Sequence, residues 1–151
     1  MKIDKAIVIL KEICSRREKC CSDIRKKLDA WDIPPDNHNT VIEALIKDKF
    51  IDERRYSVFF TNDKFKFNKW GKIKIRYALI EKGINENNID QAFENINSTD
   101  YHNTLKELLG KKLSGIKDPE KFKKKAKLIR FGQSRGFESN LLYSIIDQLL
   151  K

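Results

Sequence analysis

The chain has 151 residues with 32 basic and 22 acidic side chains, which gives a formal net charge of +10 and an isoelectric point near 9.5. This length accommodates one ordinary domain, or a few small units that share their apolar faces, and excludes two large domains. The charge indicates an acidic partner, either nucleic acid or an anionic protein surface, and anionic lipid is the weakest candidate.

Several classes of protein are disfavoured by what the sequence lacks. It has no apolar run of the roughly 18 residues that a membrane span needs, and its start, MKIDKAIVIL, has no small-residue cleavage site. We therefore expect a cytoplasmic protein without membrane contact. No glycine-rich phosphate loop, catalytic-triad order or metal-ligand spacing is present, so we expect no enzyme activity, no catalytic or metal-binding residues and no cofactor.

The cysteines form one short cluster. Cys14, Cys20 and Cys21 have no second cysteine cluster and no nearby histidine, which disfavours a disulfide framework or a zinc site. We expect reduced thiols, with Cys14 in a core and Cys20 near a helix start.

Apolar residues recur at three- and four-residue spacing along nearly the whole chain, which predicts an all-α fold. The predicted helices cover residues 3–14, 24–31, 41–46, 56–67, 75–80, 89–96, 101–109, 122–129 and 141–149. The stretch KFKF has strand-like alternation, but it continues the helical register of the preceding aromatic residues and is placed on the last turn of that helix.

The predicted helices also repeat. Each third of the chain carries the same apolar positions, four and five residues apart: Ile24, Leu28 and Ile33; Ile75, Leu79 and Ile84; and Leu128, Gly132 and Phe137, with a glycine at the middle position. The last apolar residue follows Asp32, Gly83 or Gly136, where a helix C-terminus favours a residue with positive φ.

We therefore predict three tandem three-helix units, at residues 1–49, 50–97 and 98–151, that form an elongated, curved array. Units of this size cannot bury a core alone and must pack in series. Their net charges are +2, +2 and +6, so the basic excess extends along the array and is heaviest at its end.

The stretch from Lys64 to Ile80 has six basic residues and no acid, with aromatic side chains between them. This pattern suits phosphate neutralisation and base stacking, but it also suits an amphipathic helix that begins near Gly71. On such a helix Lys72 and Arg76 share an outer face, and Lys74 lies at a different azimuth. We interpret the aromatic residues Phe67 and Tyr77 as packing residues and retain Trp70 as a candidate contact.

Two further basic groups are candidates. Arg54 and Arg55 follow two acids at a predicted helix start. Two interpretations are open: the acids cap the helix locally and the arginines are merely exposed, or the arginines contact a partner. Six cations lie within residues 121–130, where a solvated helix face is the ordinary interpretation, but three of them cluster on one side and favour an acidic partner. The complete set of candidate partner-binding and nucleic-acid-binding residues is Arg54, Arg55, Lys69, Trp70, Lys72, Lys74, Arg76, Lys123, Lys124 and Lys127.

The segments FIDERRY at 50–56 and NKWGKIKIRYALIEKGI at 68–84 resemble the RecX family, the bacterial regulators of the RecA recombinase. Three family patterns, S-x-x-E-L-x-x-K-L, Ile-Asp-Asp-x-Arg-Phe/Tyr and Gly-x-x-x-Ile-x-x-x-Leu-x-x-Lys-Gly-Ile, correspond to residues 20–28, 51–56 and 71–84. Cys20 replaces the usual capping Ser, which weakens that helix start by about 1 kcal/mol unless Asp23 compensates. Glu53 replaces the second Asp and keeps its charge.

The resemblance implies three tandem three-helix units that lie along the groove of a RecA filament and inhibit its extension, its ATPase and its recombinase activity. It also implies weak contact with single- or double-stranded DNA, and a place in DNA repair, homologous recombination and the SOS response. We expect a monomer. The alternative hypothesis is a stand-alone basic helical protein that binds nucleic acid without RecA, and a purely structural scaffold would bind neither.

Overall fold

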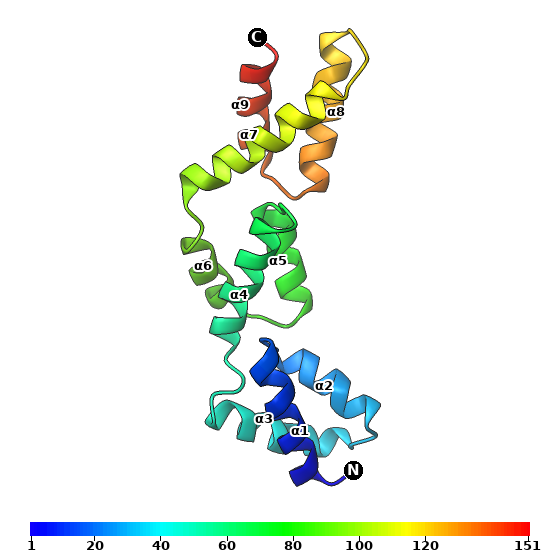
Figure 1. The fold of residues 1–151 in the computed structure, drawn as a ribbon, viewed down its shortest axis with the longest axis vertical. Helices are drawn as coiled ribbons and strands as arrows, with labels where there is room; N and C mark the ends of the chain where they lie inside the picture. Colours follow the sequence, from blue (N-terminus) through cyan, green and yellow to red (C-terminus); the bar gives the residue numbers. More distant parts are fainter. The chain divides into compact units, whose positions relative to one another are not determined.

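The computed structural model describes residues 1–151 and contains nine α-helices, one short 3₁₀ helix and no strand (Figure 1), which confirms the all-α prediction. The helices are α1 (Ile3–Arg16), α2 (Cys21–Ala30), η1 (Pro35–Asn37), α3 (His38–Lys47), α4 (Glu53–Lys66), α5 (Lys72–Glu81), α6 (Glu86–Glu94), α7 (Ser98–Ser114), α8 (Lys121–Ser134) and α9 (Ser139–Leu149). None of them combines the length and the apolar composition that a membrane span needs.

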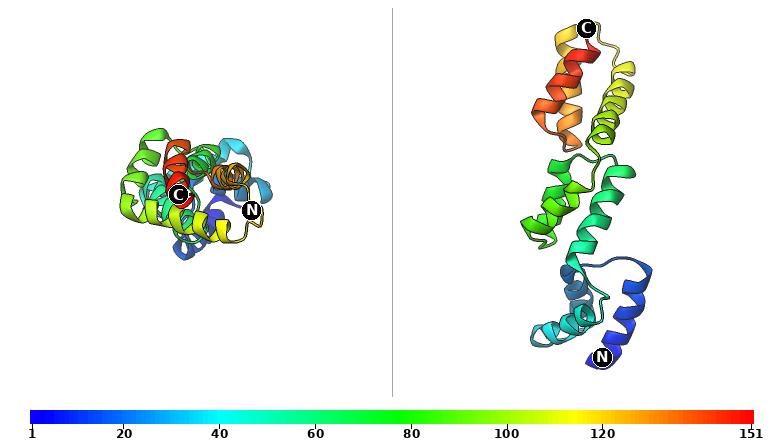
Figure 2. Two further views of the ribbon diagram at one scale, coloured as in Figure 1. Left: turned by 90° about the horizontal axis from the view of Figure 1, so that it is seen from above. Right: turned by 90° about the vertical axis from the view of Figure 1, so that its left-hand side faces the viewer.

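The chain forms two compact units. Unit 1 comprises residues 1–60 and 79–92, and unit 2 comprises residues 61–78 and 93–151. In unit 1, helices α1 and α2 each pack against α3, and their apolar positions recur every three or four residues, so that one face of each helix is buried. In unit 2, helices α7, α8 and α9 pack against one another in pairs (Figure 2).

The predicted repeat is visible in the backbone. Asp32, Gly83 and Gly136 have positive φ angles of 56°, 80° and 89°. In all three places the amide of the next residue donates to the carbonyl five residues before it, at 3.0, 3.0 and 3.1 Å. This is the Schellman pattern, which satisfies a terminal carbonyl and turns the following apolar side chain back toward the helix. The side chains of Ile33, Ile84 and Phe137 are accordingly buried, with 4%, 4% and 1% exposure.

A close backbone contact joins α5 to the α8–α9 turn in unit 2. The amide of Gly71 donates to the carbonyl of Arg135 at 2.7 Å, and the amide of Ile73 donates to the carbonyl of Gly136 at 3.0 Å. A Cβ on Gly71 would lie 2.3 Å from the Gly136 oxygen, and a Cβ on Gly136 would lie 2.3 Å from the Cβ of Lys74. Both positions therefore need glycine because two stretches of backbone meet there.

Cys20 at the N-cap and Asp23 three residues later form a capping box at the start of α2. The Asp23 carboxylate accepts a hydrogen bond from the Cys20 amide at 3.1 Å and one from Lys82 Nζ at 2.7 Å. The first bond satisfies an amide that has no partner within the helix. Partial burial alone would raise the pKa of Asp23, but the Lys82 and Cys20 hydrogen bonds outweigh it and lower that pKa below its ordinary value. Asp23 thus makes the contact through which it can compensate for the missing capping Ser, and the strength of this helix start stays a prediction.

Replacing Asp23 with alanine should lower the free energy of unfolding by about 1.5 kcal/mol at neutral pH. Because the folded-state pKa of Asp23 is depressed, its contribution is present above the unfolded pKa of about 3.9 and is lost as the pH falls through the folded pKa. Urea denaturation at pH values on both sides of that range measures this. The matched control, alanine at the exposed Asp36, should have little effect, and a difference between wild type and Asp23→Ala that persists unchanged in acid would contradict the assignment.

Candidate functional site

The basic segment around Trp70 is organised by contacts within unit 2. The Trp70 ring is half-buried and has two ammonium groups over it, Lys64 Nζ at 5.1 Å and Lys74 Nζ at 4.8 Å from the centroid. Lys69, in the turn after α4, has a φ of +57° and donates from Nζ to the Lys66 carbonyl at 2.7 Å. The chain's own lysines therefore already engage the indole ring. Each cation–π contact of this kind contributes about 0.5–2 kcal/mol.

The three cations on α5 lie over other parts of unit 2. Lys72 Nζ is 4.8 Å from the centroid of the Tyr101 ring, and the Arg76 guanidinium is 5.1 Å from that of Phe93. Lys74 Nζ lies 3.4 Å from the Ser134 carbonyl, to which it donates. All three are half-buried, so their aliphatic stems cover apolar surface while the charged ends remain near solvent.

Tyr101 holds this region to α9. Its hydroxyl accepts from the Lys72 amide at 2.9 Å and donates to the Glu138 carboxylate. Burial and the hydrogen bond to Glu138 raise the pKa of Tyr101 well above its ordinary value, so the phenol keeps its proton and remains a donor. The ring itself packs against Phe65 and Phe137, with centroids at 5.6 and 5.2 Å.

The packing interpretation of Phe67 and Tyr77 is wrong. Their side chains are 79% and 70% exposed. Phe67 follows the last residue of α4 and so leaves the helical register that predicted its burial. Tyr77 lies two residues from both Ile75 and Leu79, which places it about 200° around the helix from the buried face.

Arg54 and Arg55 differ in their surroundings within unit 1. Arg55 Nε donates to Glu18 at 2.5 Å, and its Nη2 donates to the Lys49 carbonyl at 3.1 Å. The hydrogen bond to Glu18 raises the pKa of the Arg55 guanidinium further. Arg54 is exposed and has no such partner. The geometry therefore gives Arg55 a local structural role and leaves Arg54 available for an external contact.

The cations of α8 also divide into paired and unpaired groups. Lys123 Nζ lies 3.6 Å from a Glu120 oxygen, and Lys125 Nζ lies 3.2 Å from an Asp147 oxygen. Lys124 is half-buried and Lys127 is exposed, and neither has an acidic partner. A cation without an acid beside it attracts an external anion without competition from a carboxylate of the same chain.

The structure also brings together cations that the sequence did not group. A pocket of about 670 Å³ lies between the end of α7, the following loop and α8, and we name it the α7–α8 pocket. Its lining side chains are those of Lys112, Ile116, Lys117, Lys127, Arg130, Phe131 and Ser134. The cation-rich helix was predicted from the sequence, but only the path of the loop shows that Lys117 lies beside α8.

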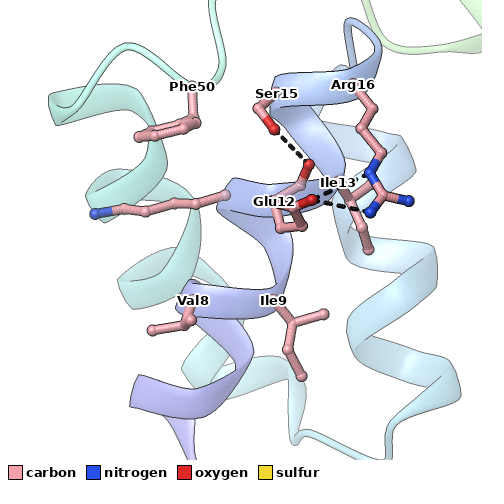
Figure 3. A pocket seen from close by; sticks show the side chains of 8 residues that line it. Val8, Ile9, Glu12, Ile13, Ser15, Arg16 and Phe50 are labelled. Carbon is pink, nitrogen blue, oxygen red and sulfur yellow. Dashed lines mark hydrogen bonds and ion pairs between the residues drawn. The ribbon is translucent and has the colours of Figure 1, made fainter.

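A hollow of the same size in unit 1 has a different character (Figure 3). It is bordered by the apolar side chains Val8, Ile9, Ile13 and Phe50. Its two cations are already paired: Lys11 with Asp48 at 2.7 Å and Arg16 with Glu12 at 2.9 Å. This hollow therefore offers apolar surface and no unpaired charge.

The cysteines have no reactive geometry. Cys14 is buried and Cys20 is the N-cap residue of α2, both as expected; Cys20 is also buried, and Cys21 is half-buried. Burial, followed by the neighbouring Glu53, raises the pKa of Cys21 to about 11, and burial also raises the pKa of the other two thiols. All three therefore remain protonated at neutral pH. No group of three or more His, Cys, Asp or Glu side chains is arranged to hold a metal ion.

Comparison with known families decides what kind of protein carries these surfaces. Residues 52–92 match the model of the RecX second three-helix domain, and residues 99–146 match that of the RecX third three-helix domain. The chain belongs to the RecX family. All ten candidate residues lie within the two matched RecX domains.

Curated RecX relatives align over most of the chain. The regulatory protein RecX of Clostridium acetobutylicum is 34% identical over 133 residues, which cover 85% of this chain and 59% of the relative. The RecX of Clostridium perfringens strain 13 is 30% identical, with 84% and 60% covered. That of Chlorobium phaeobacteroides is 27% identical, with 97% and 95% covered. The chain thus spans about 60% of the length of these clostridial relatives.

Solved RecX structures share the fold. A crystal structure of regulatory protein RecX superposes with a TM-score of 0.87 at 24% identity and covers 96% of this chain and 73% of that one. The structure of RecX from Lactobacillus salivarius gives 0.85 at 20% identity and covers 97% and 96%. The helical order described above is therefore that of RecX proteins.

Proposed function

We propose that this protein is a non-enzymatic regulator that docks along the RecA nucleoprotein filament in the cytoplasm and opposes its extension and its ATPase and recombinase activity. The observation that carries the proposal is membership of the RecX family, whose curated relatives bear the name regulatory protein RecX. The docking charge comes from exposed or half-buried cations, chiefly Arg54, Lys72, Arg76 and the α8 lysines Lys123, Lys124 and Lys127.

The proposed mechanism is multivalent contact by a monomer. If the three-helix units are laid in series, as the sequence predicts, one molecule reaches two or more neighbouring protomers. The second contact is then intramolecular, and its effective concentration reinforces weak individual contacts. Simultaneous contact with adjacent protomers would impede their movements and block addition of the next one.

The direct test is the ATPase activity of RecA on single-stranded DNA. Added protein should lower the steady rate of ATP hydrolysis in proportion to the occupied fraction of the filament, and should stop filament growth seen by electron microscopy. An ATPase rate and a filament length that stay constant at saturating protein would rule the proposal out.

The net charge and the group of basic side chains around Trp70 favour a second candidate, a helical protein that binds nucleic acid without RecA. Such a protein should bind naked DNA tightly and release several counterions, which gives a steep dependence of affinity on salt. A filament regulator should bind naked DNA only modestly.

A further inference from the structure

The α7–α8 pocket concentrates positive charge without any acid. Lys112, Lys117, Lys127 and Arg130 line it, and no Asp or Glu does. None of these four cations has an ion pair within the chain, whereas Lys123 and Lys125 on the same α8 helix pair with Glu120 and Asp147. All the cations that line the pocket are thus unpaired within the chain.

The carbonyl groups at the neighbouring helix ends do not accept hydrogen bonds from these cations. The carbonyls of Lys112 and Leu113 at the end of α7 accept hydrogen bonds from the amides of Gly115 and Ile116, at 3.1 and 3.0 Å. The Ser134 hydroxyl donates to the Phe131 carbonyl at 2.7 Å. The last-turn acceptors are therefore satisfied locally, and the lysines and the arginine remain available for an external ligand.

The lining offers almost only hydrogen-bond donors. Lys and Arg side chains donate and do not accept. A bound peptide brings an amide donor with almost every residue, and the Ser134 hydroxyl is the one side-chain acceptor that the lining offers to them. A phosphodiester backbone presents charged acceptor oxygens at each linkage and no donor of its own, which matches the lining.

Two features favour a nucleic-acid strand that is bound through its backbone and not through its bases. The Phe131 ring already has Lys112 Nζ and the Arg135 guanidinium over it, each 5.3 Å from the centroid, so the chain's own cations compete with a base for this ring. The four cations that carry the charge are exposed side chains, so the pocket is open to solvent, which suits a polymer better than a small nucleotide that an enclosed site would bury.

We propose that the α7–α8 pocket binds the phosphodiester backbone of a nucleic-acid strand, without base recognition. The proposal deepens the function proposed above and rests on it, because a RecA nucleoprotein filament contains a DNA strand. It places the contact with that strand on the third RecX domain.

The test measures binding of fluorescently labelled oligo(dT) by anisotropy over a series of salt concentrations. The double variant Lys117→Glu/Arg130→Glu should weaken binding by at least about tenfold and should lower the slope of log affinity against log salt by about 2. The matched control, Lys5→Glu/Lys26→Glu, makes the same change in net charge at exposed positions of unit 1 and should weaken binding less than about threefold. Equal effects of the two pairs, or no effect of the pocket pair, would overturn the proposal.

Competition identifies the class of ligand. Unlabelled oligo(dT) should displace the probe from the wild type, whereas ATP and oligoglutamate at the same concentration of anionic groups should not. Displacement by ATP would overturn assignment to a strand, and displacement by oligoglutamate would assign the pocket to an acidic peptide. If the charge reversals reduce helicity, Lys117→Ala/Arg130→Ala takes their place and should weaken oligo(dT) binding by about fivefold.

The outcome is separable from that of the filament proposal. Neither Lys117 nor Arg130 belongs to the proposed docking set, and the readout is naked oligonucleotide. Failure of the filament proposal would instead be seen as RecA ATPase activity that the wild-type protein does not inhibit.

Discussion

Replacing Gly136 with alanine should destabilise unit 2 by about 3 kcal/mol, far more than the same change at Gly83. Both glycines have positive φ, 89° and 80°, and both occupy the same position of the repeat. An added Cβ therefore costs about 1–2 kcal/mol in backbone strain at either position. At Gly136 the new methyl group would also lie 2.3 Å from the Lys74 Cβ and 2.6 Å from the Lys74 amide nitrogen, whereas at Gly83 nothing lies within 4 Å. Relief of that overlap requires movement of backbone and adds about 1–3 kcal/mol.

Urea denaturation followed by far-ultraviolet circular dichroism gives the two free energies of unfolding. Gly83→Ala is the matched control, because it imposes the same φ penalty without the steric contact. Equal destabilisation by the two substitutions would show that α5 does not approach the α8–α9 turn as closely as described.

Reversing the α8 charges with Lys123→Glu/Lys124→Glu/Lys127→Glu should reduce the potency of RecA inhibition by at least about tenfold. Each reversal replaces an attraction by a repulsion, and charge pairs at protein interfaces affect binding by a kilocalorie per mole or more when they are close. The glutamates fall near the start and middle of α8, where the helix dipole tolerates acids, so we expect the fold to survive. The measurement is the concentration that halves RecA ATPase activity on single-stranded DNA.

A second triple variant separates docking from net charge. Lys2→Glu/Lys5→Glu/Lys26→Glu changes the charge equally at exposed positions of unit 1 outside the candidate set. It should retain most of the inhibitory potency at physiological salt, because distant surface charges are screened over about 8 Å. Unchanged potency of the α8 variant would remove these lysines from the docking surface.

The parts of the fold that depend on local spacing were predictable from the sequence. Apolar periodicity identified all nine α-helices but not the short η1, and the equivalence of Asp32, Gly83 and Gly136 was visible as an offset from the following apolar residue. That equivalence has a local physical cause, since a Schellman turn involves only six consecutive residues. The division into units at residues 49 and 97 is not decided by local spacing and stays a prediction.

The side-chain environments were harder to predict because they depend on contacts distant in sequence. Arg55 is engaged by Glu18, 37 residues away, and Asp23 by Lys82, 59 residues away. The exposure of Phe67 follows from where α4 ends, which periodicity alone does not define. The α7–α8 pocket likewise requires the path of the loop that carries Lys117. Which of the ten candidate cations and aromatic residues contact a partner stays a prediction.

The central claim is preference for the RecA filament over free nucleic acid. It is tested most directly by titrating the labelled protein, at one physiological salt concentration, into RecA filaments on single-stranded DNA and into the same DNA without RecA. The account predicts that half-saturation on the filament needs at least about tenfold less protein, because several protomers are contacted at once. Equal affinity for the filament and the naked strand would contradict it and would favour the stand-alone nucleic-acid-binding protein.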